Sequence, residues 1–461
     1  MHRVTINIED LFNLESAVIY NPDDYKPCKH VVIDSRKVTS GSIFVAIKGD
    51  SLDGHNFVYE AVKNGCSAII INQNKLNQFD KINTTIVTVK DTTKAYGDLA
   101  AVWRKKLTAV IISLTGSNGK TTTKELIYSL LSGKYKVNKS IANNNNHIGV
   151  PLTLFDSSEK HEAVVLEHGT NHFNEIEYTA AIAKPDIALI TNIGDSHLEY
   201  LVDREGVYKE KSALLKHTMS IGGKIILNSD DVLLKKNIKK YKNVITYGFK
   251  GQPDVKGNID SYTEIGQPKL SVTYKNKVIN IILPLLGKTN ASNFLAAVTV
   301  AFLMGMTKKE ILSAVKNIIP VKGRLNYVDN NVNMLISDEY NSNPDSMKAA
   351  VDLLGRIKKY KKKILIVGDM FELGKNSAKY HADLANIISP NKNLLVLSIG
   401  KHMKYFHERL NERNISCEHF TRRDQLKKYI NGKDLGDSVI LVKGSRGMKM
   451  EEFADVIRSR D

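Results

Sequence analysis

The stretch that decides the fold is Ala109-Val-Ile-Ile-Ser-Leu114, then Thr115-Gly-Ser-Asn-Gly-Lys-Thr-Thr-Thr123, then Lys124-Glu-Leu-Ile-Tyr-Ser-Leu-Leu131. An apolar run, a glycine turn and a helical pattern in this order predict a strand, a phosphate-binding loop and a helix start. Gly116 and Gly119 let the backbone approach an anion, and N–H groups at a helix start point toward it. Lys120 can reach terminal phosphates, and the Thr121 hydroxyl can bind a Mg²⁺ shared with them. The G-x-x-G-K-T spacing is two residues shorter than the standard pattern, so a glycine turn with a chance Lys-Thr is the alternative.

The composition is that of a globular protein with several domains. A chain of 461 residues is long enough for about three domains, and 42% apolar residues with mixed charge exclude a disordered chain. No apolar run approaches the roughly 20 residues of a membrane helix, and the N-terminus lacks a signal-peptide core. The three cysteines lie far apart, which suggests neither a disulfide framework nor a zinc site. We expect a cytoplasmic monomer with no membrane insertion.

The net charge of +17 raises the question of a nucleic-acid partner. Lysine-dense stretches such as 235–242 and 356–363 carry much of this charge, and they are typical of solvated helix faces and turns. They lack the interleaved arginine and aromatic residues of a single-strand binding surface. We therefore expect no nucleic acid, and a polyanionic small substrate is equally compatible with the charge.

The chain divides into three predicted α/β units. Residues 1–90 form a small N-terminal unit with strands near 31–33, 42–47, 66–71 and 85–89, and a helix over 56–64. Residues 91–319 begin with a helix capped by Asp91 or Thr92 and continue with short apolar strands typical of a covered parallel sheet, near 109–114, 163–166, 187–191 and 224–227. A β-rich extension follows over 244–286. Residues 320–461 alternate again, with strands near 334–337, 363–367, 394–398 and 438–442, which predicts a Rossmann-like open sheet.

Two strand ends near the glycine loop carry groups that bind metal ions. Glu167 ends the strand 163–166, and a carboxylate at this edge of a nucleotide-binding sheet often completes a Mg²⁺ shell. His197 lies in the loop after the next strand, so a second cation site is predicted at the same edge. The alternatives are a carboxylate that caps the next loop and a solvated histidine. The asparagine run 143–146 offers amide donors for phosphate or sugar hydroxyls, although a polar turn explains it almost as well.

Eight motifs along the chain together resemble those of the Mur ligases. Four lie in the first part of the match: T-G-S-N-G-K-T-T-T, N-N-N-N-H-I-G-V-P-L-T-L (143–154), L-E-H-G-T-N-H (166–172) and P-D-I-A-L-I-T-N-I-G-D-S-H-L-E (185–199). The others are G-R-L (323–325), S-D-E-Y-N-S-N-P-D-S-M (337–347), G-D-M-F-E-L-G (368–374) and V-K-G-S-R-G-M (442–448). D-S-R-K-V-T-S-G-S-I-F-V-A-I-K-G (34–49) is similar to the family's uridine-nucleotide domain. The resemblance spans nearly the whole chain and is strongest to the branch that acts on UDP-N-acetylmuramoyl-tripeptide.

The resemblance implies an ATP-dependent amide ligase of peptidoglycan precursor synthesis. Such enzymes convert a carboxylate into an acyl phosphate, which an amine then attacks. Here the carboxylate would end the stem peptide of UDP-N-acetylmuramoyl-tripeptide, with diaminopimelate or lysine as its third residue, and the amine would belong to D-alanyl-D-alanine. ATP and Mg²⁺ are the implied cofactors.

The resemblance also assigns roles to residues. It implies that Lys120, Glu167, His197 and Lys211 are catalytic, and that Thr121, Glu167, His197 and Lys211, the last as a carbamate, hold two Mg²⁺ ions. The implied ATP contacts are Gly116, Ser117, Asn118, Gly119, Lys120, Thr121, Thr122, Asn290, Asn293, Arg324 and Asp338. Ser35, Arg36 and Asn145 would bind the UDP-substrate, and Asn341 and Asn343 the dipeptide. Thr289 stands where the family usually has His, so base stacking is expected to be weaker or differently supplied.

Three alternatives to this interpretation remain. A sister Mur ligase and a folate polyglutamate synthase share the central core, but the D-S-R-K-V and Y-N-S-N-P segments disfavour both. The third alternative, a phosphate-loop ATPase, would use the net charge of +17 to bind nucleic acid. If the chain is a ligase, two of its implied ATP contacts, Arg324 and Asp338, lie in the third unit. That unit must then close over the nucleotide.

Overall fold

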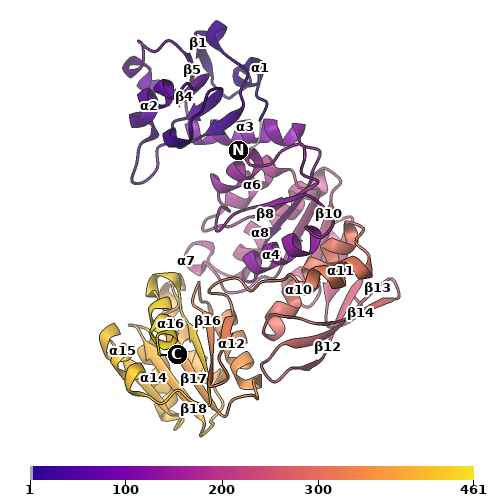
Figure 1. Cartoon of the computed structure of the whole chain (residues 1–461), viewed down its shortest axis with the longest axis vertical. Helices are drawn as coiled ribbons and strands as arrows, with labels where there is room; N and C mark the ends of the chain where they lie inside the picture. The colour runs from indigo at the N-terminus through magenta and orange to yellow at the C-terminus, as the bar shows by residue number, and fades with distance from the viewer. Residues whose placement is uncertain (1–3, 461) are drawn as a thin grey trace.

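The computed structural model describes residues 4–460, which form three sheets that follow one another along the long axis of the molecule (Figure 1). The N-terminal and C-terminal domains lie at opposite ends, and the central domain lies between them. The predicted α/β architecture of three domains is confirmed. None of the helices in this described part combines the length and apolarity that a membrane crossing requires.

The N-terminal sheet consists of short, mostly buried strands in the order β1-β5-β4-β3-β2. Only β1 runs antiparallel to its neighbour. The strands are β1 (Val18–Tyr20), β2 (His30–Val32), β3 (Ser42–Val45), β4 (Ala68–Asn72) and β5 (Thr85–Val89), with helices α1 (Ile8–Phe12) and α2 (Val58–Lys63). The helix predicted over 56–64 starts as a 3₁₀ turn over Gly54–Phe57, because Asp53 caps the His55 N–H.

Helix α3 (Thr92–Lys106) joins the N-terminal and central domains. Its cap is Asp91, as predicted, and the carboxylate accepts from the N–H groups of Thr93 and Lys94 at 2.8 and 3.0 Å. Its buried face, which includes Trp103, belongs to one apolar core that runs from the N-terminal sheet to the back of the central sheet. These two domains are therefore packed together rather than tethered.

The central sheet has the order β14-β13-β12-β11-β10-β9-β6-β8-β7. Its parallel part consists of β6 (Val110–Thr115), β7 (Val137–Lys139), β8 (Ala163–Glu167), β9 (Ile187–Ile190), β10 (Lys224–Asn228) and β11 (Val244–Gly248). The predicted β-rich extension is confirmed and continues this sheet through β12 (Val255–Tyr262), β13 (Pro268–Tyr274) and β14 (Lys277–Ile282). Strand β6 lies between β8 and β9, so the loops after these three strands meet at one edge.

Helices cover both faces of the central sheet. Helices α4 (Lys120–Leu131), α10 (Gly287–Leu303) and α11 (Lys308–Val315) pack on one face, and α5 (Gly149–Phe155), α6 (Glu175–Ala183) and α8 (Arg204–Ser220) on the other. Because successive strand residues point to opposite faces, Ile112 and Leu114 pack with α4 and α10 while Ile111 packs toward α3. Two short helices, α7 (Leu198–Leu201) and α9 (Val232–Asn237), follow β9 and β10.

The C-terminal sheet has the order β15-β16-β20-β17-β18-β19, and only β15 is antiparallel. Its strands are β15 (Asn326–Asp329), β16 (Asn333–Asp338), β17 (Lys362–Gly368), β18 (Leu394–Ile399), β19 (Cys417–Phe420) and β20 (Ser438–Lys443). The helices are α12 (Pro344–Arg356), α13 (Ser377–Asp383), α14 (Met403–Glu412), α15 (Arg423–Gly432) and α16 (Glu451–Arg458). Strands β1, β7, β15 and β19 were not predicted. All four lie at sheet edges and are only partly buried; β1 has only three residues, and the other three lack a continuous apolar run.

Candidate active site

The loop between β6 and α4 has the backbone of an anion-binding turn. Gly116 and Gly119 have φ angles of 152° and 80°, conformations that favour glycine. Gly119 precedes α4, and no side chain caps this helix start. The N–H groups of the first helical turn are therefore available to an anion. Ser117, Asn118, Gly119, Lys120 and Thr122 line the adjoining cavity, and Thr121 is half-buried in the same turn.

The loop after β9 holds the phosphate loop in place. Asn192 accepts from the Ser117 N–H through its carbonyl at 3.0 Å and from the Asn118 N–H through Oδ1 at 2.9 Å. A Cβ on Gly116 would lie 1.9 Å from Thr191 Oγ1, and a Cβ on Gly119 would lie 2.2 Å from Asn293 Oδ1. Both glycines are therefore required by the packing as well as by their backbone angles.

Two lysines one turn apart on α4 lie below this loop. Lys120 Nζ donates to the Gly116 carbonyl at 2.9 Å, so its side chain folds back across the loop. Burial lowers the pKa of Lys120, Glu167 opposes this shift, and Arg324 adds to it. Lys124 is fully buried, and its Nζ donates to the Ser140 carbonyl at 2.6 Å and lies 3.9 Å from Glu167 Oε2. Lys124 was missed, although its i, i+4 spacing from Lys120 put both on one helix face.

Glu167 ends β8 with its carboxylate buried beside the cavity. Its Oε1 accepts from Asn145 Nδ2 at 3.0 Å, while Oε2 is buried without a hydrogen-bond donor. Lys124 Nζ, 3.9 Å away, compensates this buried oxygen only in part, and a closer cation or donor would stabilise it. Asn145, predicted to contact the UDP-substrate, lines the cavity and orients this carboxylate.

Lys211 is buried in the middle of α8. Its Nζ has no hydrogen-bond partner, and burial, with a smaller contribution from Lys120, lowers its pKa well below the usual value. Burial therefore favours the neutral amine over an unpaired ammonium at this depth.

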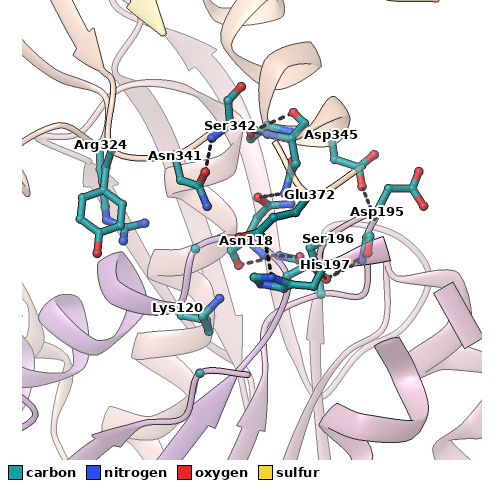
Figure 2. Close-up of a pocket in the computed structure, with 18 of the residues that line it drawn as sticks. Asn118, Lys120, Asp195, Ser196, His197, Arg324, Asn341, Ser342, Asp345 and Glu372 are labelled. Carbon is teal, nitrogen blue, oxygen red and sulfur yellow. Dashed lines mark hydrogen bonds and ion pairs between the residues drawn. The ribbon is translucent and has the colours of Figure 1, made fainter. Parts of the chain in front are cut away.

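His197 lies in the loop before α7 with a φ of 53° and lines the cavity. Its Nδ1 lies 2.6 Å from Glu372 Oε2, a residue of the C-terminal domain (Figure 2). The close contact with His197 is the main reason why the pKa of Glu372 is lowered. A carboxylate on one ring nitrogen orients an imidazole for a ligand on the other nitrogen.

The C-terminal domain adds its own side chains to the same cavity, which has a volume of about 1050 Å³ (Figure 2). Arg324 stacks on the Tyr340 ring at 4.1 Å, and Asn343 Nδ2 donates to Asn118 Oδ1 of the phosphate loop at 2.9 Å. Asp338 lines the cavity, where the buried Lys443 binds its Oδ2 at 2.6 Å, and Asn341 lies beside them. The C-terminal domain thus contacts the phosphate loop, which is the arrangement expected for a ligase whose third unit closes over the nucleotide.

Helix α10 supplies the remaining predicted nucleotide contacts. Asn290 and Asn293 are almost fully buried on the cavity wall, and Thr289 lines it next to them. Asn290 Nδ2 donates to the Leu286 carbonyl at 2.9 Å, which fixes its amide orientation.

Ser35 and Arg36 lie in the N-terminal domain and do not line this cavity. Ser35 is buried and donates to Glu60 Oε2 at 2.6 Å, whereas Arg36 is exposed and pairs with Asp34 at 2.8 Å. Their predicted contact with the uridine nucleotide concerns a separate surface and stays a prediction.

Several cavity residues were not singled out from the sequence: Tyr340, Asp345, Glu372, Lys443 and Arg446. All five stand inside motifs that were noted, but nothing in a motif shows which of its side chains point inward.

The polar groups around the cavity fit a nucleotide and its metal ions. Within residues 4–460, no three histidine, cysteine or acidic side chains gather closely enough to hold a metal by themselves. Mg²⁺, however, usually takes one or two carboxylates together with phosphate oxygens and water. Glu167, whose Oε2 lacks a hydrogen-bond donor, and the hydroxyl of Thr121 in the first turn of α4 are the oxygen donors that suit such a site. The fold and the cavity together define a multidomain α/β enzyme of the phosphate-loop class.

Comparisons with known proteins give the family. Three family models match successive parts of the chain: the Mur ligase family catalytic domain (residues 27–104), the Mur ligase middle domain (114–301) and the Mur ligase glutamate ligase domain (323–446). A UDP-N-acetylmuramoyl-tripeptide–D-alanyl-D-alanine ligase from Bacillus subtilis is 33% identical, with 98% of each chain covered. The chain belongs to the Mur ligase family.

Solved structures agree with this assignment. MurF from Acinetobacter baumannii superposes with a TM-score of 0.87 at 28% identity, covering 99% of this chain and 100% of that chain. MurF ligase from Thermotoga maritima, solved in complex with ADP, has a TM-score of 0.81 at 26% identity, covering 93% and 97%.

Proposed function

We propose that the protein is an ATP-dependent ligase that joins D-alanyl-D-alanine to UDP-N-acetylmuramoyl-tripeptide. The observation that carries the proposal is the single cavity lined by the phosphate loop, by Glu167 and by Arg324 of the C-terminal domain. The similarity to curated ligases of this name over nearly the full length supports the same substrates. The reaction belongs to peptidoglycan precursor synthesis, and we place it in the cytoplasm, with the protein acting as a monomer.

The nucleotide would lie between the central and C-terminal domains. The first-turn N–H groups of α4 and Lys120 hold its phosphates, and Arg324 approaches from the other domain. Asn290 and Asn293 face the base side, and Asp338 the ribose. Since Lys443 already pairs with Asp338, that carboxylate is oriented before a ribose hydroxyl reaches it.

Mg²⁺ would be held by Thr121 and Glu167 at the phosphate loop and by His197 and Lys211 at a second position. When bound, the ions neutralise the charge between two anions that must meet. Glu372 keeps the His197 ring oriented, and the neutral Lys211 amine is the form that CO₂ can convert to a carbamate. Carbamylation would turn an unpaired buried amine into an anionic oxygen ligand.

The chemistry then proceeds in two balanced steps. A carboxylate oxygen of the stem peptide attacks the γ-phosphorus of ATP, the bond to the bridging oxygen breaks, and ADP leaves. The neutral amine of D-alanyl-D-alanine attacks the acyl carbon, loses a proton, and phosphate leaves as the amide forms. Lys120 and Arg324 stabilise the negative charge that develops on the transferred phosphoryl group, which is the main task of such a site.

The two substrates would approach from opposite sides. Ser35 and Arg36 of the N-terminal domain would hold the uridine nucleotide, with Asn145 along the path of the peptide, and Asn341 and Asn343 would lie near the dipeptide. We assign residues 1–90 to UDP-substrate binding, 91–319 to ATP binding, and 320–461 to closure over ATP and dipeptide binding.

The test is phosphate release from ATP by the purified protein. Release should require both D-alanyl-D-alanine and a UDP-N-acetylmuramoyl-tripeptide, and comparing the diaminopimelate and lysine forms identifies the third stem residue. Lys120→Ala should reduce amide formation by at least about a hundredfold, because it removes a charge aimed at the transferred phosphate. Lys235→Ala, an exposed lysine on α9, is the matched control. Stimulation by DNA or RNA instead of the two substrates would refute the ligase proposal.

A further inference from the structure

The loop that carries His197 is closed by an arginine. Arg204, the first residue of α8, binds Asp195 with both arms of its guanidinium: Nε to Oδ1 at 2.7 Å and Nη2 to Oδ2 at 2.9 Å. The segment between the two residues contains two strained backbones, at His197 (φ 53°) and Val202 (φ 71°). A bidentate pair across the ends of such a segment restricts the positions that His197 can adopt.

The same guanidinium reaches the C-terminal domain. Arg204 Nη2 lies 3.2 Å from each carboxylate oxygen of Asp345, which is in the first turn of α12. Asp345 Oδ2 also accepts from the Asp195 N–H at 3.3 Å (Figure 2). Asp345 thus contacts both members of the pair that closes the loop.

The packing around this contact is close. A Cβ on Gly194 would lie 2.3 Å from Asp345 Oδ2, so the neighbouring loop leaves room for the carboxylate only because residue 194 is glycine. The side chain of Asp195 is mostly buried, with 18% exposed. Asp195, and to a smaller extent Asp345, raise the pKa of Arg204, so this arginine stays charged.

We propose, on the basis of the ligase function above, that Arg204 and Asp345 form a latch that couples docking of the C-terminal domain to the position of the loop bearing His197. Both are positioning residues. Docking supplies the second carboxylate to a guanidinium that Asp195 has already ordered, so little further side-chain entropy is lost. In the undocked state Arg204 keeps only Asp195, and the loop is less restrained.

Other contacts beside the latch also join the C-terminal domain to loops of the central domain. The Glu199 N–H donates to the Glu372 carbonyl at 3.3 Å, and Asn343 binds Asn118 of the phosphate loop. Docking therefore engages the phosphate loop and the His197 loop at the same time. Arg204 is distinguished by joining α8, the helix that carries Lys211, to both Asp195 and the C-terminal domain.

The test is a double-mutant cycle on Arg204→Gln and Asp345→Asn. Asp345→Asn should lower kcat about fivefold, the lower range of typical couplings between sites. Arg204→Gln, which also loses the pair with Asp195, should lower it at least as much, and the double variant should be no worse than Arg204→Gln. Asp345→Glu, which keeps the charge, should recover most of the activity. The KM for ATP should change less than kcat, because the phosphate loop itself is unaltered.

The matched control is the bidentate pair Arg422 and Asp424 at the start of α15, with Nη2 and Oδ2 2.8 Å apart, which lies wholly within the C-terminal domain. Arg422→Gln and Asp424→Asn should leave kcat unchanged. Thermal unfolding should be alike in all single variants, because the latch acts on docking and not on the fold of either domain.

A second readout does not depend on the reaction. X-ray scattering with an ATP analogue should show less compaction for Asp345→Asn than for Asp424→Asn. Equal compaction, or additive losses of kcat in the cycle, would overturn the latch. If the unaltered protein does not ligate D-alanyl-D-alanine, the proposed function fails, while the scattering comparison still decides on the latch.

Discussion

Val202 is the clearest case of strain at a single residue. Its φ of 71° and ψ of −60°, with the Asp203 N–H donating to the Leu201 carbonyl at 2.9 Å, form a tight γ-turn that a β-branched residue rarely adopts. Its side chain is 75% exposed, so it gains little from burial. The strain therefore serves to connect the short helix after His197 to Asp203, the cap of α8.

We predict that Val202→Gly stabilises the protein by about 1 kcal/mol. Relief of roughly 1–3 kcal/mol of backbone strain should exceed the entropy that glycine adds to the unfolded chain, about 0.5–1 kcal/mol. The measurement is the midpoint of thermal unfolding. The control is Val232→Gly at the first residue of α9, where valine is 80% exposed and the backbone is helical; there a loss of stability is expected. Destabilisation at both sites would contradict the assignment of strain.

His168 is buried next to the catalytic edge but belongs to the core. Its Nδ1 lies 2.9 Å from Thr179 Oγ1 and its Nε2 2.9 Å from Ser113 Oγ. Burial lowers the pKa of His168 to about 3. The ring is therefore neutral in the folded protein, and its contribution to stability depends on pH.

We predict that His168 makes the fold acid-labile. Between pH of about 6.5 and pH of about 3, His168 is protonated in the unfolded state but not in the folded state. The free energy of unfolding therefore falls as the pH drops through this window. At pH 5 the loss is about 2 kcal/mol. His168→Met should show a smaller difference in unfolding free energy between pH 7 and pH 5, measured by urea unfolding with Trp103, the one tryptophan, as the fluorescent reporter. An identical pH slope in both proteins would contradict this role.

At the scale of elements, the phosphate loop between β6 and α4 keeps its shape because three neighbouring residues pack against it. Thr191 and Asn192 after β9 support the loop from one side, and Asn293 of α10 closes it from the other. The helix start can therefore present its N–H groups without a cap of its own.

We predict that Gly119→Ala weakens ATP binding by at least tenfold and destabilises the central domain by about 1–3 kcal/mol. The added Cβ would meet Asn293 at 2.2 Å, and the φ of 80° disfavours any L side chain. Calorimetric titration with ATP and thermal unfolding measure the two effects. Gly355→Ala on α12, where a Cβ meets nothing within 4 Å, should leave ATP binding unchanged and stabilise its helix slightly.

At the scale of the whole molecule, the three domains are not equally independent. The N-terminal and central domains share one apolar core through α3. Among residues 4–460, the core of the C-terminal domain takes Leu286 from the central domain, with Ile265 packed against it. Across the cavity, the two domains meet through polar contacts such as Asn343 with Asn118 and Asp345 with Arg204. Separating polar contacts costs little free energy in water, whereas separating two domains that share an apolar core costs much more.

We therefore predict that movement on ligand binding is confined to the C-terminal domain. Energy transfer between dyes on the central and C-terminal domains should change when an ATP analogue and the UDP-substrate are added together. Dyes on the N-terminal and central domains serve as the control and should keep their distance. A change in the second pair only would contradict the prediction, because it would place the hinge at α3.

Much of the fold could be predicted from local patterns. Short apolar runs marked the inner strands of all three sheets, and Asp91 marked the start of α3, because these features depend on residues a few positions apart. Four edge strands, β1, β7, β15 and β19, escaped prediction because they are short and partly exposed, whereas the edge strand β2 was predicted from the apolar residues 31–33. The phosphate loop was predicted on its own residues, while the roles of Lys211, Asn290 and Arg324 came from resemblance to a family and stay predictions.

The amino-acid sequence by itself determined the phosphate loop and the alternation of strands and helices, since glycine angles, helix starts and strand periodicity are set by near neighbours. Only the tertiary structure decided that Lys211 is a buried, unpaired amine, that Glu372 faces His197, and that Arg204 lies between Asp195 and Asp345. These contacts join residues that are distant along the chain. Burial and distance between such residues arise from the packing of whole domains, which no local spacing encodes.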